Sequence, residues 1–430
     1  MKKFSLLLLL FSLFVNFSYA QNDYNYWFQL GYNATTPQEQ IKYYNKAIEL
    51  YTGDSAPFNN RGLAKHNLED YQGAIADFNK AIQLNPKNAA IYVNRGNAKR
   101  KIDDNKGAIT DYNKAIQLDP SYANAYFGRG VAKSYLNDSK GAIEDYDKTI
   151  KLDPSFVNAY GNRGNEKYNL GDKQGALLDY NKAIQLNPEG SNTYNSRGVI
   201  KQELGDSTGA MQDYNKAINL EPDFILALKN RASLSYDLKK YQDAIYDYSS
   251  LIDLSTSGTE YYYDMRGDCK KALEQYDEAI SDYKIAINLN PDYKWSYSSL
   301  ANLYYYNKKD YKNAIVYFKK GLEKEPKNYS INQSLGWAYF DDGSYIQAIQ
   351  YLKESLTCET DEYVDPNIGI ALAFYLLKDN NEAKKFLDEA IKIKPYLSKG
   401  MEGIAELEKE GYTYSDFQKE KLKLMFEELK

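Results

Sequence analysis

The 430-residue sequence is short of the side chains on which most active sites depend. It holds one histidine, His66, and two cysteines, Cys269 and Cys358. A lone histidine without a cluster of acids or cysteines around it cannot form a metal site, and a Ser-His-Asp arrangement would have to use His66, which sits inside an ordinary repeat helix. A glycine-rich phosphate loop is also missing, because the glycines recur with the internal repeat described below. The sequence therefore predicts no enzymatic centre, no cofactor and no metal, with His66 as a surface residue.

Excess basic charge and long apolar runs are equally scarce. The 54 Lys and Arg residues are interspersed with 59 Asp and Glu residues, and the formal net charge is -5. This balance lacks the basic field that neutralises phosphates, so nucleic acid is not an expected partner. Past the first 20 residues the sequence has no apolar stretch of the roughly 20 residues that cross a bilayer. We therefore expect no transmembrane segment in the mature chain.

Residues 1–20 have the three-part pattern of a secretion signal. Lys2 and Lys3 precede a short apolar run, and the small residue Ala20 stands before a predicted cleavage ahead of Gln21. The pattern predicts an exported protein that is periplasmic, associated with the cell envelope, or extracellular. A membrane anchor that stays attached is the alternative. In an oxidising compartment a disulfide would need two close cysteines, and the repeat count places the two cysteines two units apart, so unpaired and mostly buried thiols are predicted.

An internal period organises most of the chain. Alanines recur every 34 or 35 residues from Ala74 to Ala383, and five prolines from Pro86 to Pro222 are each 34 residues apart. A fixed period of this length indicates stacked supersecondary units. Within residues 55–88 the apolar positions predict two helices, and the second of them ends at the Asn-Pro step because the residue before a proline avoids the helical region.

This pattern resembles the tetratricopeptide repeat. One unit carries the family's positions in order: Phe58, Gly62, Ala74, Phe78, Ala81 and Pro86. A later unit has the family's usual first helix in Leu335, Gly336 and Tyr339. The resemblance covers roughly residues 23–397. It implies an all-α, right-handed superhelical solenoid of about eleven helix pairs, whose first helices line a concave side where extended peptides lie.

The repeat differs from the family pattern at one paired position. An arginine replaces the leucine before the glycine, and an aspartate follows sixteen residues later, in seven units: Arg61, Arg95, Arg129, Arg163, Arg197, Arg231 and Arg266, with Asp77, Asp111, Asp145, Asp179, Asp213, Asp247 and Asp282. Three later units have Leu300, Leu335 and Ile370, with Tyr317, Tyr351 and Phe386 as partners. Because both positions change together, we predict an ion pair between the two helices of a unit, replaced later by an apolar contact. A ladder of arginines that binds acidic ligands is the alternative.

The regularity of the repeat divides the chain into segments. After the signal come a divergent N-terminal repeat or cap over 21–54, a regular array over 55–258 and a divergent array over 259–397. Capping helices are expected over 398–430. Residues 255–259 lack the expected proline and predict a joint or an altered step between units.

Asparagines on the first helices are the candidate peptide-binding residues. They stand directly before the repeat arginine or three residues beyond that position: Asn60, Asn94, Asn97, Asn162, Asn165 and Asn230. An amide both donates and accepts, so a row of amides can bind a peptide backbone of any sequence. The resemblance implies the same role. Gly128 and Ser196 interrupt the row, and the general abundance of asparagine is the alternative explanation. The family's other mode, which binds a terminal carboxylate, is not indicated, because Ser233 and Met265 stand where it needs asparagines.

Two functions follow from these observations. The first is a non-catalytic exported scaffold that binds a protein or peptide in the groove of the solenoid. The alternative is a structural or assembly factor that self-associates or docks through the tyrosine-rich second half and the C-terminal helix. Tyrosine is the most overrepresented residue, with 44 copies against 16 phenylalanines. An exposed aromatic patch over 261–306 would favour the alternative.

Overall fold

The computed structural model describes residues 23–358 and 363–429. The predicted secretion signal lies outside these residues. All regular elements in the described ranges are helices, and the chain divides into two compact units, with the boundary between Pro222 and Asp223. None of the helices in these ranges is long and apolar enough to cross a membrane.

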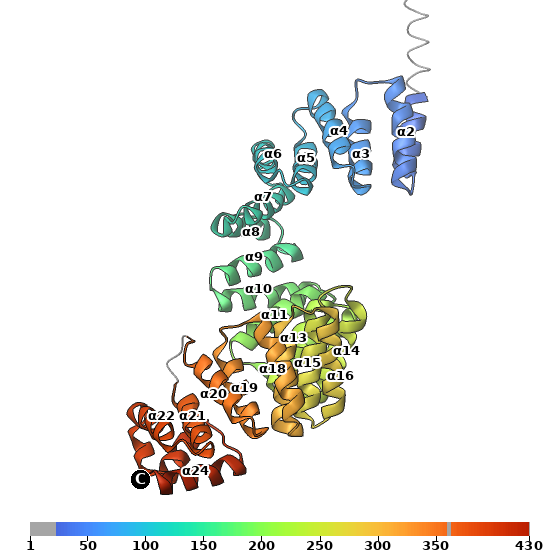
Figure 1. Cartoon of the computed structure of the whole chain (residues 1–430). Coiled ribbons are helices and arrows are strands. Elements are labelled where there is room, and N and C mark those ends of the chain that lie inside the picture. Colours follow the sequence, from blue (N-terminus) through green and yellow to red (C-terminus); the bar gives the residue numbers. More distant parts are fainter. Residues whose placement is uncertain (1–22, 359–362, 430) are drawn as a thin grey trace, which may run out of the picture. The chain divides into compact units, whose positions relative to one another are not determined.

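The first unit is a series of helix pairs, and each pair packs on the next (Figure 1). Residues 23–33 are helical and form the first pair with α2. The helices of this unit are α2 (Pro37–Leu50), α3 (Ser55–Asn67), α4 (Tyr71–Leu84), α5 (Ala89–Lys101), α6 (Asn105–Leu118), α7 (Ala123–Tyr135), α8 (Ser139–Leu152), α9 (Val157–Asn169), α10 (Lys173–Leu186), α11 (Ser191–Glu203) and α12 (Ser207–Leu220).

The second unit is also built of helix pairs, and after the last pair come η2, α23 and α24. Its elements are α13 (Ile225–Asp237), α14 (Tyr241–Leu254), α15 (Thr259–Ala272), α16 (Tyr276–Leu289), α17 (Lys294–Asn302), the π-helical η1 (Leu303–Lys308), α18 (Tyr311–Lys324), α19 (Tyr329–Asp341), α20 (Tyr345–Ser355), α21 (Val364–Leu376), α22 (Asn380–Ile393), the 3₁₀-helical η2 (Pro395–Lys399), α23 (Met401–Lys409) and α24 (Asp416–Glu428). Within the described residues the pairs run from residues 23–33 with α2 to α21 with α22, eleven in all.

A repeated cap begins the second helix of five pairs, from α3–α4 to α11–α12. The carboxylate of Asp70 accepts a hydrogen bond of 2.9 Å from the backbone nitrogen of Gly73, and the same bond recurs with Asp104, Asp138, Asp172 and Asp206. A side chain that satisfies a free N–H of the first turn stabilises a helix start by about 1 kcal/mol. A Cβ at residue 73 would lie 2.1 Å from Oδ2 of Asp70, so a larger residue there would require the capping side chain to shift.

The two helices of a regular pair pack through an aromatic ring laid on a glycine. A Cβ added to Gly96 of α5 would lie only 2.9 Å from the ring of Tyr112 in α6. Gly130, Gly164, Gly198 and Gly267 meet tyrosine rings in the same way. These rings are buried, with Tyr112 fully inaccessible. The core of the repeat thus accounts for part of the high tyrosine content, because tyrosine can pack a buried ring while its hydroxyl stays at a polar edge.

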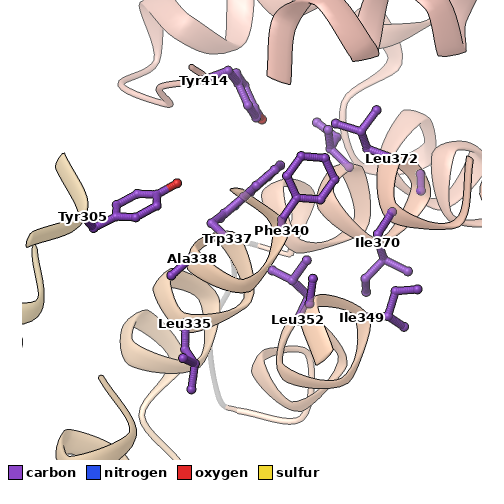
Figure 2. Packing of buried hydrophobic residues seen from close by; sticks show 14 of the residues in the cluster. Tyr305, Leu335, Trp337, Ala338, Phe340, Ile349, Leu352, Ile370, Leu372 and Tyr414 are labelled. Atoms are coloured by element: carbon purple, nitrogen blue, oxygen red, sulfur yellow. The ribbon is translucent and has the colours of Figure 1, made fainter. Parts of the chain in front are cut away.

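The interior of the second unit changes in character towards its end. A large apolar cluster extends from Ala279 to Phe426 and includes the residues around Trp337 (Figure 2). The predicted joint at 255–259 lies inside this unit, where α14 and α15 pack on each other. Cys269 and Cys358 are both buried and unpaired, as predicted.

The C-terminal segment folds back on the last repeats as a cap. Leu422 and Met425 of α24 are fully buried, and Figure 2 shows Tyr414, which precedes α24, pointing toward Trp337 of α19. The amide of Gln418 donates to both carboxylate oxygens of Asp341, at 3.1 Å each. Leu422, Met425 and Phe426 of α24 are thus buried within the chain, whereas Phe417 and Leu424 are 42% and 39% exposed.

Candidate peptide-binding face on the first helices

Ion clusters hold the first helix of each regular pair against the second. The guanidinium of Arg95 in α5 donates from Nε and Nη2 to the two oxygens of Asp111 in α6, at 2.9 and 2.5 Å. Lys99, one turn further along α5, lies 2.8 Å from the same carboxylate. The side chain of Asp111 is only 3% exposed. The structure confirms this predicted arginine–aspartate contact in all seven units: Arg61–Asp77, Arg95–Asp111, Arg129–Asp145, Arg163–Asp179, Arg197–Asp213, Arg231–Asp247 and Arg266–Asp282.

The remaining guanidinium nitrogen reaches the preceding pair. Nη1 of Arg95 donates to Oδ1 of Asn79 in α4 at 2.7 Å, and Arg61 and Arg129 make the same bond to Asn45 and Asn113. The guanidinium of Arg95 also lies 5.6 Å from the ring centre of Tyr92. Each of its three nitrogens thus donates to an acceptor inside the protein, and one of its faces lies against Tyr92. The arginines therefore fix the first helices to their neighbours, and this geometry does not support the alternative of an arginine ladder that binds acidic ligands.

Stacked aromatics replace the ion clusters in the last pairs. Tyr304 and Tyr317 stack with ring centres 5.8 Å apart, Tyr339 and Tyr351 at 5.4 Å, and Phe374 and Phe386 at 5.9 Å. An apolar contact therefore replaces the ion cluster, as predicted. The first-helix ring in each contact, however, occupies the position equivalent to Lys99, four residues beyond Leu300, Leu335 and Ile370.

The six candidate asparagines divide between the two units. Asn60, Asn94, Asn97, Asn162 and Asn165 belong to the first unit, and Asn230 to the second. Asn94 donates to Oδ1 of Asn59 at 3.0 Å, and Asn59 in turn donates to Asn60 at 3.1 Å. A short amide chain therefore connects α3 and α5.

Tyrosine hydroxyls hold the amides that stand three residues further along. The hydroxyl of Tyr112 donates to Oδ1 of Asn97 at 2.7 Å, and that of Tyr180 donates to Oδ1 of Asn165 at 2.6 Å. Asn162 is hydrogen-bonded to Tyr146. Burial raises the pKa of Tyr112 to about 12, so this hydroxyl keeps its proton at any physiological pH. Because the hydroxyl occupies the amide oxygen, the Nδ2 group of Asn97 or Asn165 is left to donate to a ligand.

Four of the six amides line cavities on this face. Asn94 and Asn97 line a cavity of about 420 Å³ between α3, α5 and α7, called the α5 cavity below. Asn162 and Asn165 line a cavity of about 170 Å³, and Asn165 also lines an adjoining cavity of about 210 Å³. Asn60 lies outside these three cavities.

The two interruptions of the asparagine row are part of these cavities. Gly128 lines the α5 cavity, and a Cβ there would lie 2.6 Å from the ring of Tyr112. Ser196 lines both smaller cavities and is hydrogen-bonded to Tyr180. The row is therefore broken in sequence, while the face continues as a series of polar hollows.

Three basic residues of the α5 cavity were not predicted from the sequence. His66 of α3, with Arg100 and Lys101 of α5, lines it. His66 is half-buried, contrary to the prediction of a surface residue, and its ring lies 5.2 Å from that of Tyr71. Burial first, and then the charges of Lys101 and Arg100, lower the pKa of His66. The signal was present in the register, because His66 and Arg100 each stand five residues beyond a repeat arginine.

Half of the tyrosines in the two runs of the second half, 261–263 and 304–306, are core residues. Tyr262, Tyr304 and Tyr305 are buried, whereas Tyr261 and Tyr306 are 45% and 50% exposed. The continuous aromatic patch over 261–306 that would favour assembly is therefore reduced to separate exposed rings. In the part of the chain that the structure describes, no group of three or more His, Cys, Asp and Glu residues is arranged to hold a metal ion.

Comparison with known families matches the helix pairs one by one. A model described as "TPR repeat" matches residues 96–134 and 267–307, and two models described as "Tetratricopeptide repeat" match 56–88 and 157–189, and 123–156, 191–224, 296–328 and 365–396. Together these ranges cover more than half of the chain. The chain belongs to the tetratricopeptide repeat family. This tetratricopeptide repeat protein has no match among curated proteins.

Solved structures with similar folds include other proteins of this type. MamA is 26% identical over 37% of this chain and 94% of its own, with a TM-score of 0.35. YrrB, described as a TPR protein with an unusual peptide-binding site, is 23% identical over 43% of this chain and 96% of its own, with a TM-score of 0.37. PilF of Pseudomonas aeruginosa is 20% identical over 50% of this chain and 98% of its own, with a TM-score of 0.44.

Proposed function

We propose that this tetratricopeptide repeat protein is an exported, non-catalytic scaffold that binds an extended peptide segment of a partner protein along the first helices of its first unit. The family supports the general role, since its arrays are typically protein-interaction scaffolds. The observation that carries the proposal is the row of cavities lined by asparagines, two of which, Asn97 and Asn165, have their amide oxygens held by buried tyrosines.

The chemistry of this face suits a peptide backbone. Each backbone unit offers one donor and one acceptor, and an amide side chain can satisfy both. Asn97 and Asn165 are oriented by Tyr112 and Tyr180 before a ligand arrives, which lowers the entropic cost of binding. The ion clusters beneath fix the helices that carry these amides. The face is thus prepared for extended chains of varied sequence.

Site-specific photo-crosslinking in the source cells tests the location of this interface. p-Benzoylphenylalanine is placed at Asn158, which is exposed on the rim of the 170 Å³ cavity, or at Gln174, which is exposed on the second helix α10. A partner protein should crosslink from residue 158 and not from residue 174. Equal products from both positions, or none from residue 158, would contradict the proposal.

An amide-deletion variant tests the mechanism. We expect Asn162→Ala with Asn165→Ala to weaken capture of the crosslinked partner about tenfold, since each lost hydrogen bond contributes about 0.5–1.5 kcal/mol. The matched control is Gln72→Ala with Gln174→Ala, which removes two exposed amides from second helices. Circular dichroism should show both variants folded. Capture unchanged by the first pair would refute the role of the asparagines.

Export is part of the proposal and rests on the pattern of residues 1–20. Fractionation of the source cells followed by mass spectrometry of the N-terminus should find the protein in the periplasmic, envelope or secreted fraction, beginning at Gln21. A cytosolic protein that retains Met1 would contradict it.

A second candidate function, self-association, is favoured by one observation in the second unit. Leu226, Tyr261 and Trp295 stand at equivalent places in the first turns of α13, α15 and α17, and they are 56%, 45% and 59% exposed. Light scattering after size exclusion tests it. A dimer that dissociates when all three residues become serine would support assembly, and a monomeric wild-type protein would oppose it.

A further inference from the structure

The C-terminal helix α24 lies on first-helix residues of the last pairs. Its Gln418 contacts Tyr305 of η1 and Asp341 of α19, with the amide nitrogen 3.5 Å from the tyrosine hydroxyl and 3.1 Å from each carboxylate oxygen. The ring of Tyr414, just ahead of α24, lies 5.8 Å from the ring of Trp337 in α19 (Figure 2). We call the three contacted residues, Tyr305, Trp337 and Asp341, the α19 strip.

The α19 strip occupies repeat positions that line hollows in the first unit. Its residues stand two, five or six places beyond the arginine position of their pairs, which Leu300 and Leu335 fill here. The first-unit residues at those three places that line cavities are His66, Asn97, Arg100, Lys101, Asn165, Tyr168 and Asn169. The second unit thus covers, with its own last helix, a face of the repeat that is hollowed in the first unit.

The helix α24 has its own start and attaches through one side. Residues 410–415, between α23 and α24, are not helical. Ser415 and Gln418 form a reciprocal capping box, in which the serine hydroxyl accepts from the backbone nitrogen of Gln418 at 3.2 Å and the glutamine oxygen accepts from that of Ser415 at 2.8 Å. Such a box satisfies two N–H groups of the first turn without help from the repeats. The buried side of the helix consists of Gln418, Leu422, Met425 and Phe426.

Two carboxylates under the docked segment have no ion-pair partner. Asp341 accepts from Gln418, and Asp365, which is 4% exposed, accepts from Trp337 at 2.6 Å and lies beside the hydroxyl of Tyr414. Among the described residues no Lys, Arg or His forms an ion pair with either carboxylate, and burial raises the pKa of both. Docking of α24 therefore desolvates charges that no cation neutralises, which offsets part of the gain from its apolar residues. We expect α24 to detach more easily than the helices beneath it.

We propose that α24 exchanges between copies of this chain: it leaves its own α19 strip and docks on the strip of a second copy. The second copy is the partner because the strip already fits this helix, and exchange reproduces each contact without a new surface. The fit is that of an amphipathic helix in a groove, with buried residues at 414, 418, 422, 425 and 426. This site lies in the second unit and does not depend on the proposed peptide-binding face of the first unit.

The tether at residues 410–415 determines when exchange occurs. A short tether holds a docked segment at an effective concentration of about 1 mM. Copies at lower concentrations therefore stay closed on their own helix, and exchange becomes favourable where the local concentration of the protein is higher or where the helix of one copy is loosened.

Two complementary variants of the full chain test the exchange. Gln418→Ala with Leu422→Ala disables the helix and leaves the strip, and it should weaken docking about a hundredfold or more, since a hydrogen bond to a carboxylate and a buried leucine side chain are lost. Asp341→Arg disables the strip and leaves the helix. An equimolar mixture at about 0.1 mM, below the effective concentration of the tether, should form a dimer that neither variant forms alone, as size exclusion with light scattering will show.

The matched control replaces Asp341→Arg by Asp342→Arg, at the exposed neighbouring residue. That chain keeps its helix on its own strip, so its mixture with the helix variant should gain no dimer. A peptide with the sequence of residues 412–429 should dissociate the mixed dimer, and the same peptide with both alanines should not. A mixture without added dimer, or equal association with the control, would overturn the proposal. Peptide binding to the helix variant without association of the two chains would also overturn it and would assign the strip to a helix of another protein.

Hydrogen exchange of the wild-type chain tests whether α24 detaches at all. Its amides should exchange about tenfold faster or more than those of α19, because detachment opens α24 alone. Exchange of both helices at one rate would show that α24 is an integral part of the core and would contradict the proposal, as would loss of protection in α19 when only Gln418 and Leu422 are replaced. If the larger side chain of Asp341→Arg lowers the protection of α19, Asp341→Ala takes its place in the mixture.

Discussion

The chain carries two solutions to the same packing problem, and exchanging one for the other tests the role of the ion clusters. Asp111→Ala removes the carboxylate that pairs with Arg95 at 2.5 Å and with Lys99 at 2.8 Å. The two cations are 19% and 20% exposed, so they are left largely desolvated and unpaired. Removing one partner of a buried ion pair typically costs 3–5 kcal/mol, and the remaining exposure of the cations puts our expectation near the lower end, at about 3 kcal/mol.

A later pair of the same chain supplies the sequence of a compensating variant. Arg95→Leu, Lys99→Tyr and Asp111→Tyr together reproduce the residues at 300, 304 and 317, where two tyrosines stack at 5.8 Å. Burying matched apolar groups in place of an ion cluster is often neutral or stabilising. We therefore expect the triple variant to recover stability to within about 1 kcal/mol of wild type, far above Asp111→Ala.

Urea unfolding followed by circular dichroism measures the free energies, and native-state hydrogen exchange localises the change to α5 and α6. Localised exchange matters because a repeat array can lose one pair without unfolding as a whole. A cost below about 0.5 kcal/mol for Asp111→Ala would match an exposed surface pair and refute the reasoning. So would a triple variant that is as unstable as the single one.

Three further predictions follow from other contacts. Burial raises the pKa of Asp264 to about 6, above its ordinary value of 3.8, so the folded protein binds this proton more tightly and gains stability as the pH falls from about 6 to about 4. Asp264→Asn should therefore stabilise the second unit by up to about 3 kcal/mol at pH 8 and by little at pH 4. Thermal unfolding at the two pH values measures this difference, and equal effects at both would contradict the prediction. On α9, Gly164→Ala should destabilise the protein by about 1–3 kcal/mol, because the new Cβ would lie 2.9 Å from Tyr180. Gly161→Ala should stabilise it by up to about 1 kcal/mol, because no atom lies within 4 Å of a Cβ there. Denaturant midpoints that shift in the same direction in both variants would contradict this prediction. Trp337→Phe removes the indole N–H that donates to the buried Asp365 at 2.6 Å, and the loss should destabilise the protein by about 1–3 kcal/mol. It should also speed tryptic cleavage in α24, which packs on the same repeats. Trp295→Phe, at an exposed site, should change neither quantity.

The fold could be predicted from the sequence because the repeat supplies its own comparison. The arginine at 61 and the aspartate at 77 recur together and disappear together, so one chain shows what normally needs many relatives. The bond from Nη1 of Arg61 to Asn45 was not foreseen. It lies between adjacent pairs, and the period alone does not determine how one pair is rotated on the next.

The candidate site was predicted only in part for a similar reason. Asn94 and Asn97 were recognised from their spacing on one helix, and the structure places both in the α5 cavity. His66 was interpreted within its own helix, where nothing marks it. Its neighbours Arg100 and Phe156 lie 34 and 90 residues away and approach it only through the stacking of three successive pairs. Gln418 and Asp341, which are 77 residues apart, illustrate the same limit at the C-terminal cap.

The change from ion clusters to stacked aromatics at α17 has a thermal consequence. Apolar burial loses strength on cooling because its driving force near room temperature is entropic, while the free energy of charged contacts follows a different temperature course. The stability of the pairs from α17 onward therefore depends more steeply on temperature than the stability of the pairs held by Arg61 to Arg197. On chilling, the aromatic pairs lose stability first, and on moderate warming toward room temperature they regain it.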